Sequence, residues 1–415
     1  MNIIYTQFIK LYGFAVKLAA SFNPKAKLWV DGRRDWQSKM HDAISPKDRI
    51  IWVHCSSLGE FEQGRPVMEK IRENYPNHKL AVSFFSPSGY EVRKDYQGAD
   101  YIFYLPLDTP KNAKDLIRIL NPEILILVKY EYWYNLLSEL SKQNIKVIVI
   151  SAVIKESSLF FKSWASEFRE IISKIDHFFV QDIDSKNLLN AININAVTIA
   201  GDTRFDRVKE IRESHQALDF VNDFKGNSKL IVVGSSWPDD EKILVEFINE
   251  HLPDDWKVIF APHNIIDKQI QNLANGLEKK VSILSKSNAD EINTSQILIV
   301  DKIGVLTQIY AYSDISYVGG GFTKTGVHNT LEPAVFGVPI VFGPNYSNYF
   351  EAIDLVEISA AISYSDKTEF FEIMLQLLPN EKERNSRGKA AYEYIQSKPN
   401  ATELILKYLK EMIKQ

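Results

Sequence analysis

From residue 50 onward, short apolar runs alternate with amphipathic stretches, which is the pattern of parallel α/β folds. A polar stretch at 207–228 divides this alternation into two series. We therefore predict an α/β protein with two Rossmann-like, doubly wound domains that face a central cleft, where the strands' carboxyl ends bind ligands. The expected strands are 50–55, 80–85, 101–105, 124–128, 147–150, 177–180 and 197–200, then 230–233, 257–260, 297–300, 315–318, 339–342 and 361–364.

The predicted limits are 1–40 for an amino-terminal segment, 41–206 for the first domain and 207–415 for the second. Two charged helices, at 380–397 and 401–414, are expected to run back across the cleft.

The composition excludes several classes of protein. The chain has 415 residues, 45% of them hydrophobic and 25% charged, which suits a globular protein with a large core. A net charge of −4 argues against a nucleic-acid partner. The single cysteine, Cys55, excludes an intrachain disulfide and a multi-cysteine zinc site, and fits a reducing compartment.

The amino terminus has a different character from the rest of the chain. Residues 1–39 contain seven basic side chains against two acidic ones. Within 1–22, helical spacing puts the polar and small residues on one narrow stripe and leaves a broad apolar face. Two lysines inside the segment argue against a clean membrane span, and no signal-peptide cleavage site follows. We expect an amphipathic helix lying in the interface of an anionic cytoplasmic leaflet; the alternative is a helix packed on the protein's own core.

A glycine-rich segment at 319–348 predicts a nucleotide site. Three glycines follow the strand at 315–318, and a helix is expected to open near His328 and Asn329 with Glu332 in its first turn. Such a turn exposes backbone N–H groups and a positive helix end, which suit a phosphate. A carboxylate one turn further on can accept hydrogen bonds from ribose hydroxyls. The candidate residues are Gly319, Gly320, Gly321, His328, Asn329 and Glu332.

Polar residues also follow three strands of the first domain. Glu60, after the strand at 50–55, is placed either to act as a general base or to serve as an ordinary first-turn acid of a helix. Ser86 either caps a helix or helps to bind an oxyanion, and its spacing favours capping. The loop at 129–135 offers a charged, aromatic sugar pocket or simple packing. The further candidates on this side are Ser57, Gly59, Ser88, Lys129 and Glu131.

The domain boundary and the second domain add four candidates. Arg204 could pair with a phosphate or carboxylate, and Ser235, Ser236 and His263 lie on strand-end loops of the second series. Each of these loops alone reads as a turn or cap, whereas six on one edge of two sheets indicate a site. The pair Asp182 and Asp184 could clamp a cation, although helix capping is the favoured reading. No cofactor or metal is expected, because the histidines lack ligand spacing.

In order along the chain, these motifs resemble the 3-deoxy-D-manno-octulosonic acid (Kdo) transferases. The resemblance covers almost the whole chain and implies a metal-independent, inverting glycosyltransferase of the GT-B fold. Such an enzyme takes CMP-Kdo as donor and a lipid A precursor, lipid IVA, as acceptor, at the cytoplasmic face of the bacterial inner membrane. The motifs are Ser56-x-x-Gly59-Glu60, Ser86-Pro87-Ser88-Gly89, Pro106-x-Asp108, Glu131-x-Trp133-x-Asn135, Gly201-x-x-Arg204-Phe205-Asp206, Gly234-Ser235-Ser236 and Gly326-x-His328-Asn329-x-Leu331-Glu332-Pro333.

The resemblance also implies roles. Glu60 is the general base, 41–206 is the acceptor side, and the glycine and His-Asn-x-Leu-Glu block binds the nucleotide together with Arg204, which replaces the commoner lysine. Three departures stand out: Lys129 where the family has an acid, no arginine between Pro262 and His263, and Val153 in place of an arginine. The competing hypotheses are another GT-B transferase or UDP-sugar epimerase, and a non-catalytic, membrane-attached nucleotide-binding protein.

Overall fold

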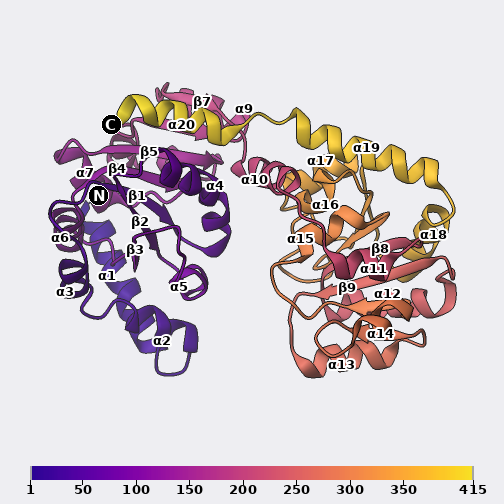
Figure 1. Cartoon of the computed structure of the whole chain (residues 1–415). Coiled ribbons are helices and arrows are strands. Elements are labelled where there is room, and N and C mark those ends of the chain that lie inside the picture. The colour runs from indigo at the N-terminus through magenta and orange to yellow at the C-terminus, as the bar shows by residue number, and fades with distance from the viewer. Residues whose placement is uncertain (1, 414–415) are drawn as a thin grey trace. The chain divides into compact units, whose positions relative to one another are not determined.

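The computed structural model describes residues 2–413, which form two compact units. The first unit comprises the residues up to Asp206 and those from Pro399 onward, and the second unit is Arg207–Lys398. The end of the segment expected at 207–415 thus belongs to the first unit: α19 (Glu381–Ser397) lies in the second unit and α20 (Ala401–Met412) in the first (Figure 1). Residue 414, the expected end of the last helix, lies outside the described residues.

The first unit contains a seven-stranded sheet in the order β3-β2-β1-β4-β5-β6-β7, with every pairing parallel. Because the chain first builds outward from β1 to β3 and then returns to the other side of β1, the order reverses between β1 and β4. This topological switch point is where open α/β sheets bind ligands. The strands are β1 (Ile50–Cys55), β2 (Lys79–Phe84), β3 (Tyr101–Tyr104), β4 (Pro122–Val128), β5 (Lys146–Ala152), β6 (His177–Val180) and β7 (Val197–Ile199).

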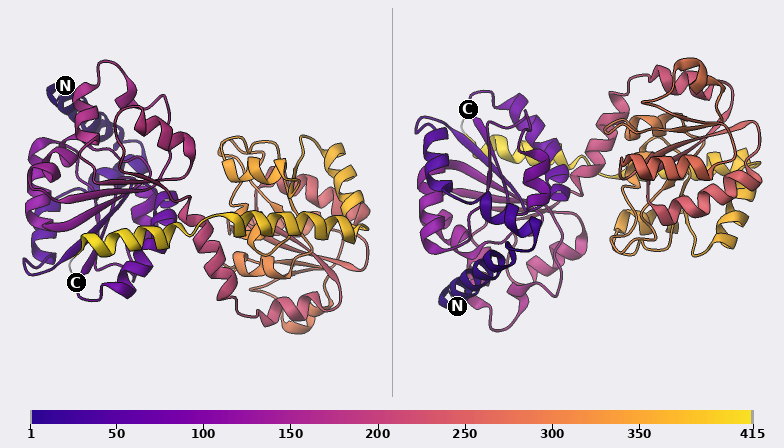
Figure 2. Two further views of the ribbon diagram at one scale, coloured as in Figure 1. Left: turned by 90° about the horizontal axis from the view of Figure 1, so that it is seen from above. Right: turned by 90° about the horizontal axis from the view of Figure 1, so that it is seen from below.

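Helices cover both faces of this sheet (Figure 2). Helix α6 shows why they form: Thr109 caps its amino end, Pro110 starts it, Leu116 and Leu120 are buried, and Asn121 ends it in the left-handed conformation. One face packs against α3 (Trp36–Ala43), α6 (Pro110–Leu120), α7 (Tyr134–Lys142), η1 (Leu159–Phe161) and α8 (Ser166–Ile172), and the other against α4 (Leu58–Asn74) and α20. The unit also contains α5 (Pro87–Arg93), α9 (Ile183–Asn190) and the start of α10 (Thr203–Glu213).

The second unit repeats the plan with a parallel sheet in the order β10-β11-β9-β8-β12-β13-β14, whose switch point lies between β8 and β12. The sequence did not predict β10, which has three residues at the sheet edge. The strands are β8 (Lys229–Ser236), β9 (Trp256–Pro262), β10 (Val281–Ile283), β11 (Ile297–Ile299), β12 (Ile315–Val318), β13 (Ile340–Phe342) and β14 (Ala361–Ser363). The helices are α11 (Asp219–Lys225), α12 (Pro238–His251), α13 (Asp267–Gly276), α14 (Ala289–Thr294), α15 (Leu306–Ile309), η2 (Tyr310–Tyr312), α16 (Leu331–Val335), α17 (Phe350–Glu357) and α18 (Lys367–Leu377).

The amino-terminal helix α1 (Asn2–Ala19) packs on the protein through Thr6, Ile9 and Gly13, while Lys10 and Lys17 of the polar stripe are exposed. Thr6 and Gly13 are buried, and a Cβ at Gly13 would lie 2.4 Å from the Leu107 side chain. Eight large apolar side chains in this part of the chain are exposed by 42–81%, whereas Ile9 and Trp29 are buried. The helix therefore does not pack on the core through its apolar face. These side chains are Ile3, Ile4, Phe8, Leu11, Phe14, Leu18, Phe22 and Leu28.

Two buried polar contacts fix this terminus to the first sheet. Tyr5 donates a hydrogen bond of 2.8 Å to Asp108. After α2 (Pro24–Asp31), the Arg33 guanidinium lies over the Trp29 ring and donates to the carbonyls of Phe85 and Leu105. Among residues 2–413, no helix is long and apolar enough to cross a membrane.

Candidate functional site

In the first unit, Glu60 lies in the first turn of α4, directly beyond the end of β1. It is 7% exposed. Its Oε2 accepts hydrogen bonds from the backbone N–H of Ser57, at 3.0 Å, and of Ser56. Glu60 is thus a first-turn acid, as one reading of the sequence held, and also a buried carboxylate at the switch point of the sheet.

The surroundings of Glu60 raise the pKa of its carboxyl group from 4.5 to about 7. Burial is the largest cause, because it penalises the charged form, and the nearby charge of Glu131 adds to it. The two backbone N–H groups and Lys129 act in the opposite direction. A carboxylate with a pKa near neutrality suits a general base.

The loop after β4 brings Glu131 and Lys129 to the same switch point. Lys129 has a φ of +68°, a left-handed conformation that is costly for a residue with a side chain and recurs at functional sites. The Glu131 side chain is 13% exposed, and its Oε2 lies 3.7 Å from Nε2 of His54 in β1. The lysine that replaces the family's acid therefore opposes the rise in the pKa of Glu60.

A cavity of about 440 Å³ lies beside this loop, at the ends of β4 and β5. Its wall is aromatic and aliphatic, with Lys155 as its charged residue. Val153, which replaces the family's arginine, is part of the wall. The other lining residues are Tyr130, Tyr132, Ser157, Ser158, Leu159, Phe160 and Phe168.

The remaining acceptor-side candidates have local roles. Ser57 is the N-cap residue of α4, and a Cβ at Gly59 would meet no atom within 4 Å. Ser86 accepts a hydrogen bond from the N–H of Ser88 and caps α5, as its spacing predicted. Asp182 likewise caps α9 by accepting from Ser185, which supports the capping reading of that motif.

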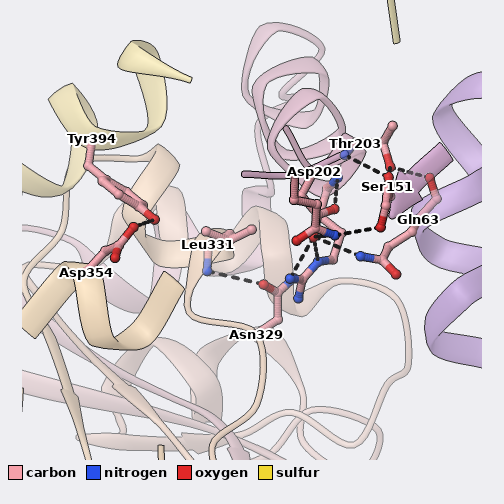
Figure 3. Close-up of polar contacts among 10 residues, drawn as sticks. Gln63, Ser151, Asp202, Thr203, Asn329, Leu331, Asp354 and Tyr394 are labelled. Carbon is pink, nitrogen blue, oxygen red and sulfur yellow. Dashed lines mark hydrogen bonds and ion pairs between the residues drawn. The ribbon is translucent and has the colours of Figure 1, made fainter. Parts of the chain in front are cut away.

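Arg204 lies in the first unit and contacts Asp202. Its Nε and Nη2 each lie 2.9 Å from Oδ2 of Asp202, a carboxylate that is 2% exposed. Gln63 of α4 donates to the same oxygen at 2.8 Å (Figure 3), and Gln181 donates to it at 3.2 Å. A buried carboxylate thus holds the guanidinium in place, and sequence reasoning did not select Asp202.

In the second unit, the glycine turn differs from the expected phosphate loop. The Gly319 N–H pairs with the Gly234 carbonyl at 2.9 Å, and the Gly320 N–H donates to Asp240 at 2.9 Å. These two N–H groups are therefore not exposed. The glycines instead permit close backbone packing, since a Cβ at Gly319 would lie 2.3 Å from the Ser235 carbonyl oxygen.

The helix after this turn also differs from expectation. It begins at Leu331, later than predicted, and α16 has five residues. Glu332 does lie in its first turn. The carboxylate accepts hydrogen bonds from Asn329 at 3.0 Å and Thr307 at 2.8 Å, so Asn329 orients Glu332.

Three rings stack at the ends of β8, β9 and β12. The His263 ring stacks on those of both Trp237 and His328, with centroid separations of 4.7 and 4.5 Å, while the Trp237 and His328 rings lie side by side, 6.3 Å apart and nearly coplanar. Trp237 Nε1 donates to Nε2 of His328 at 2.8 Å. Burial and the neighbouring His263 lower the pKa of His328 to about 4, so this ring is neutral at physiological pH.

Sequence reasoning did not select Trp237 and Asp240, whose hydrogen bonds hold the ends of β8 and β12 and the glycine turn together in the second unit. Asp240 is fully buried, and its carboxylate accepts hydrogen bonds from the N–H groups of Trp237 and Gly320 and from Tyr317. The bond from the Trp237 N–H to Asp240 is half of a capping box at the start of α12; because tryptophan has no side-chain acceptor, no Ser/Thr-x-x-Glu/Gln pattern marks it in the sequence. Ser236 donates to Glu241, whereas Ser235 kinks the strand with a φ of +51°.

Within residues 2–413, no group of three or more histidine, cysteine or carboxylate side chains is arranged to hold a metal ion.

Comparison with solved structures identifies the class of fold. The UDP-GlcNAc 2-epimerase of Neisseria meningitidis matches 88% of this chain and 100% of its own, with a TM-score of 0.58 and 16% identity. The wall teichoic acid polymerase TagF matches 98% of this chain and 100% of its own, with a TM-score of 0.51 and 15% identity. The chain therefore has a GT-B-like fold.

Sequence comparison narrows the class to a family. The family model for 3-deoxy-D-manno-octulosonic-acid transferase (kdotransferase) matches residues 32–207. The 3-deoxy-D-manno-octulosonic acid transferase of Chlamydia trachomatis serovar D is 28% identical over 88% of this chain and 86% of its own. That of Haemophilus influenzae is 24% identical over 90% of each. In sequence, the chain is therefore similar to the Kdo transferases, a family of glycosyltransferases, over most of its length.

Proposed function

We propose that this protein transfers Kdo from CMP-Kdo to a lipid A precursor, lipid IVA, with Glu60 as the general base. The observation that carries the proposal is the buried Glu60 carboxylate at the switch point of the first sheet, with a pKa of about 7 in a Kdo transferase fold. At neutral pH about half of such a group is ionised and able to accept a proton.

In the proposed reaction, Glu60 takes the proton of an acceptor hydroxyl while that oxygen attacks the anomeric carbon of Kdo. The bond between this carbon and the phosphate oxygen breaks on the opposite side, so the configuration inverts and CMP leaves with the electron pair. Protein cations and N–H groups then stabilise the phosphate without a metal ion. Arg204, which Asp202 holds rigidly, is the candidate cation of the first unit.

On the donor side, Glu332 would accept hydrogen bonds from the ribose. Asn329 and Thr307 hold its carboxylate, and the neutral His328 beside Trp237 offers a ring N–H rather than a charge. Because the Gly319 and Gly320 N–H groups already have protein partners, we assign these glycines to close packing of the turn. Ser235 and His263 complete this set at the ends of β8 and β9.

On the acceptor side, the exposed apolar face of α1 would lie on the anionic inner-membrane surface. Tyr5 and Arg33 fix that terminus to the unit that carries Glu60, so the helix that would contact the membrane and the proposed base belong to the same unit. The cavity beside Glu131, with its apolar wall and Lys155, suits an acylated, phosphorylated acceptor.

The decisive experiment is mass spectrometry of the lipid made from CMP-Kdo and lipid IVA by the purified full-length protein. We expect a mass gain of one or more Kdo residues, with CMP released only when both substrates are present. CMP release without acceptor, or no lipid product, would refute the proposal. The competing epimerase function has a fold likeness behind it, and is tested by incubating the protein with UDP-GlcNAc alone.

A further inference from the structure

His54 lies in β1 and is fully buried, yet it contacts three side chains from two other segments, β2 and the loop after β4. Its Nδ1 lies 2.8 Å from the hydroxyl oxygen of Ser83, the residue opposite it in β2. Its Nε2 lies 3.2 Å from Nε1 of Trp133 and 3.7 Å from Oε2 of Glu131. The ring thus connects the centre of the sheet to the loop that carries Glu131.

The donors around His54 determine its proton. An indole N–H can only donate, so His54 Nε2 must accept from Trp133 and carries no proton. The ring hydrogen is therefore on Nδ1 and is donated to Ser83, which also accepts from Trp52 Nε1 at 2.8 Å. This arrangement is satisfied only by the neutral Nδ1–H tautomer.

We propose that His54 is a positioning residue for the reaction at Glu60: its neutral ring holds Trp133 and its loop in place and does not form an ion pair with Glu131 beside the base. The inference rests on the proposed role of Glu60 as the general base. A protonated His54 would instead donate to Glu131, only 3.7 Å away, and form a buried ion pair.

The consequence for catalysis follows from the charges that act on Glu60. Glu131 raises the pKa of Glu60 and Lys129 lowers it, while Cys55 and Tyr130 lie in the field of both carboxylates. If an imidazolium neutralised Glu131, the base would become a weaker proton acceptor. Trp133 thereby preserves the strength of the base by keeping His54 neutral.

The test is Trp133→Phe, which removes the N–H donor but keeps an aromatic ring against Phe85. In the native protein the ring centroids of Trp133 and Phe85 lie 4.7 Å apart. Nε2 can then take a proton and pair with Glu131. We expect the acid limb of kcat/KM against pH to move to lower pH by about one unit. The matched control is Trp164→Phe, since Trp164 is 65% exposed in the same unit, and it should leave the profile unchanged.

A second variant separates a charge effect from a loss of packing. In a His54→Gln background, Trp133→Phe should cause no shift, because glutamine cannot become a cation. A uniform fall in kcat/KM at all pH values in Trp133→Phe, or the same shift in both backgrounds, refutes the proposal.

Nitrogen-15 NMR of the native protein gives a readout independent of activity. The histidine signals that change in Trp133→Phe should show a protonated Nδ1 and an unprotonated Nε2 at neutral pH. The opposite tautomer or an imidazolium overturns the inference. If neither the native protein nor any variant transfers Kdo, the proposed function fails, but the tautomer of His54 can still be measured.

Discussion

Replacing Glu60 with glutamine should make the protein more stable and nearly inactive. Burial raises the pKa of this carboxyl group from 4.5 to about 7, so the folded protein favours the protonated form more than the unfolded chain does. That preference adds stability below about pH 4.5 and is lost as the pH rises to 7. At about 1.4 kcal/mol per pH unit, the cost of ionised Glu60 above pH 7 is about 3 kcal/mol.

Glutamine imitates the protonated acid, because its amide oxygen can still accept from the N–H groups of Ser56 and Ser57. The stability of Glu60→Gln relative to the native protein should therefore be about zero at pH 4.5 and rise to about 3 kcal/mol at pH 8. Urea unfolding followed by tryptophan fluorescence measures this, since five of the seven tryptophans belong to the first unit.

The exposed Glu156 of the same unit gives a matched control, and Glu156→Gln should show no such dependence on pH. Kdo transfer by Glu60→Gln should fall by about 10²–10⁴, the range for loss of a general base. A variant that is equally or less stable than the native protein at pH 8 would refute the reasoning about burial. A stabilised variant with full activity would remove Glu60 from catalysis.

Four further outcomes are expected. Replacing Phe8 and Leu11 together by aspartate should abolish co-sedimentation with anionic liposomes while leaving activity on a water-soluble acceptor intact; unchanged binding would remove α1 from the membrane surface. Gly320→Ala should destabilise the second unit by about 1–3 kcal/mol more than Gly226→Ala, as measured by chemical unfolding of both variants. Both glycines have a positive φ, but only a Cβ at Gly320 would meet the backbone, 2.7 Å from the carbonyl oxygen of Gly326. Leu159→Asp, at the wall of the 440 Å³ cavity, should raise KM about tenfold for an acylated acceptor and leave KM for its deacylated form unchanged; equal effects would contradict acyl binding. Kdo transfer should survive EDTA, and its abolition, with recovery on adding a divalent cation, would show a metal requirement.

Within residues 2–413, thirteen of the fourteen strands were predictable, because a buried parallel strand is a continuous apolar run bounded by turn residues. Strand β10 was missed because its three residues, Val281–Ile283, are too few to form a pattern. The glycine turn was found, but the N–H groups of Gly319 and Gly320, which were expected to be exposed, have protein partners. Glycines that expose N–H groups and glycines that allow backbones to touch have the same sequence signature, and only the position of Asp240 and Ser235 distinguishes them.

The apolar side chains of the amino terminus were visible in the sequence, but their direction was not. A helix with a broad apolar face can bury that face in its own protein or present it outward. Contacts made by Tyr5, Thr6 and Gly13 decide this, and they depend on Asp108, Asn135 and Leu107, about a hundred residues away or more.

The sequence by itself determined two α/β series, the resemblance to the Kdo transferases and the loops that carry Glu60, Glu131 and Glu332, since apolar periodicity and local motifs are properties of neighbouring residues. The tertiary structure decided the strand order that brings the ends of β1 and β4 together, and with it the pKa of Glu60 and the tautomer of His54. Burial, charge proximity and hydrogen-bond direction arise between residues distant in the chain, and no local pattern encodes them.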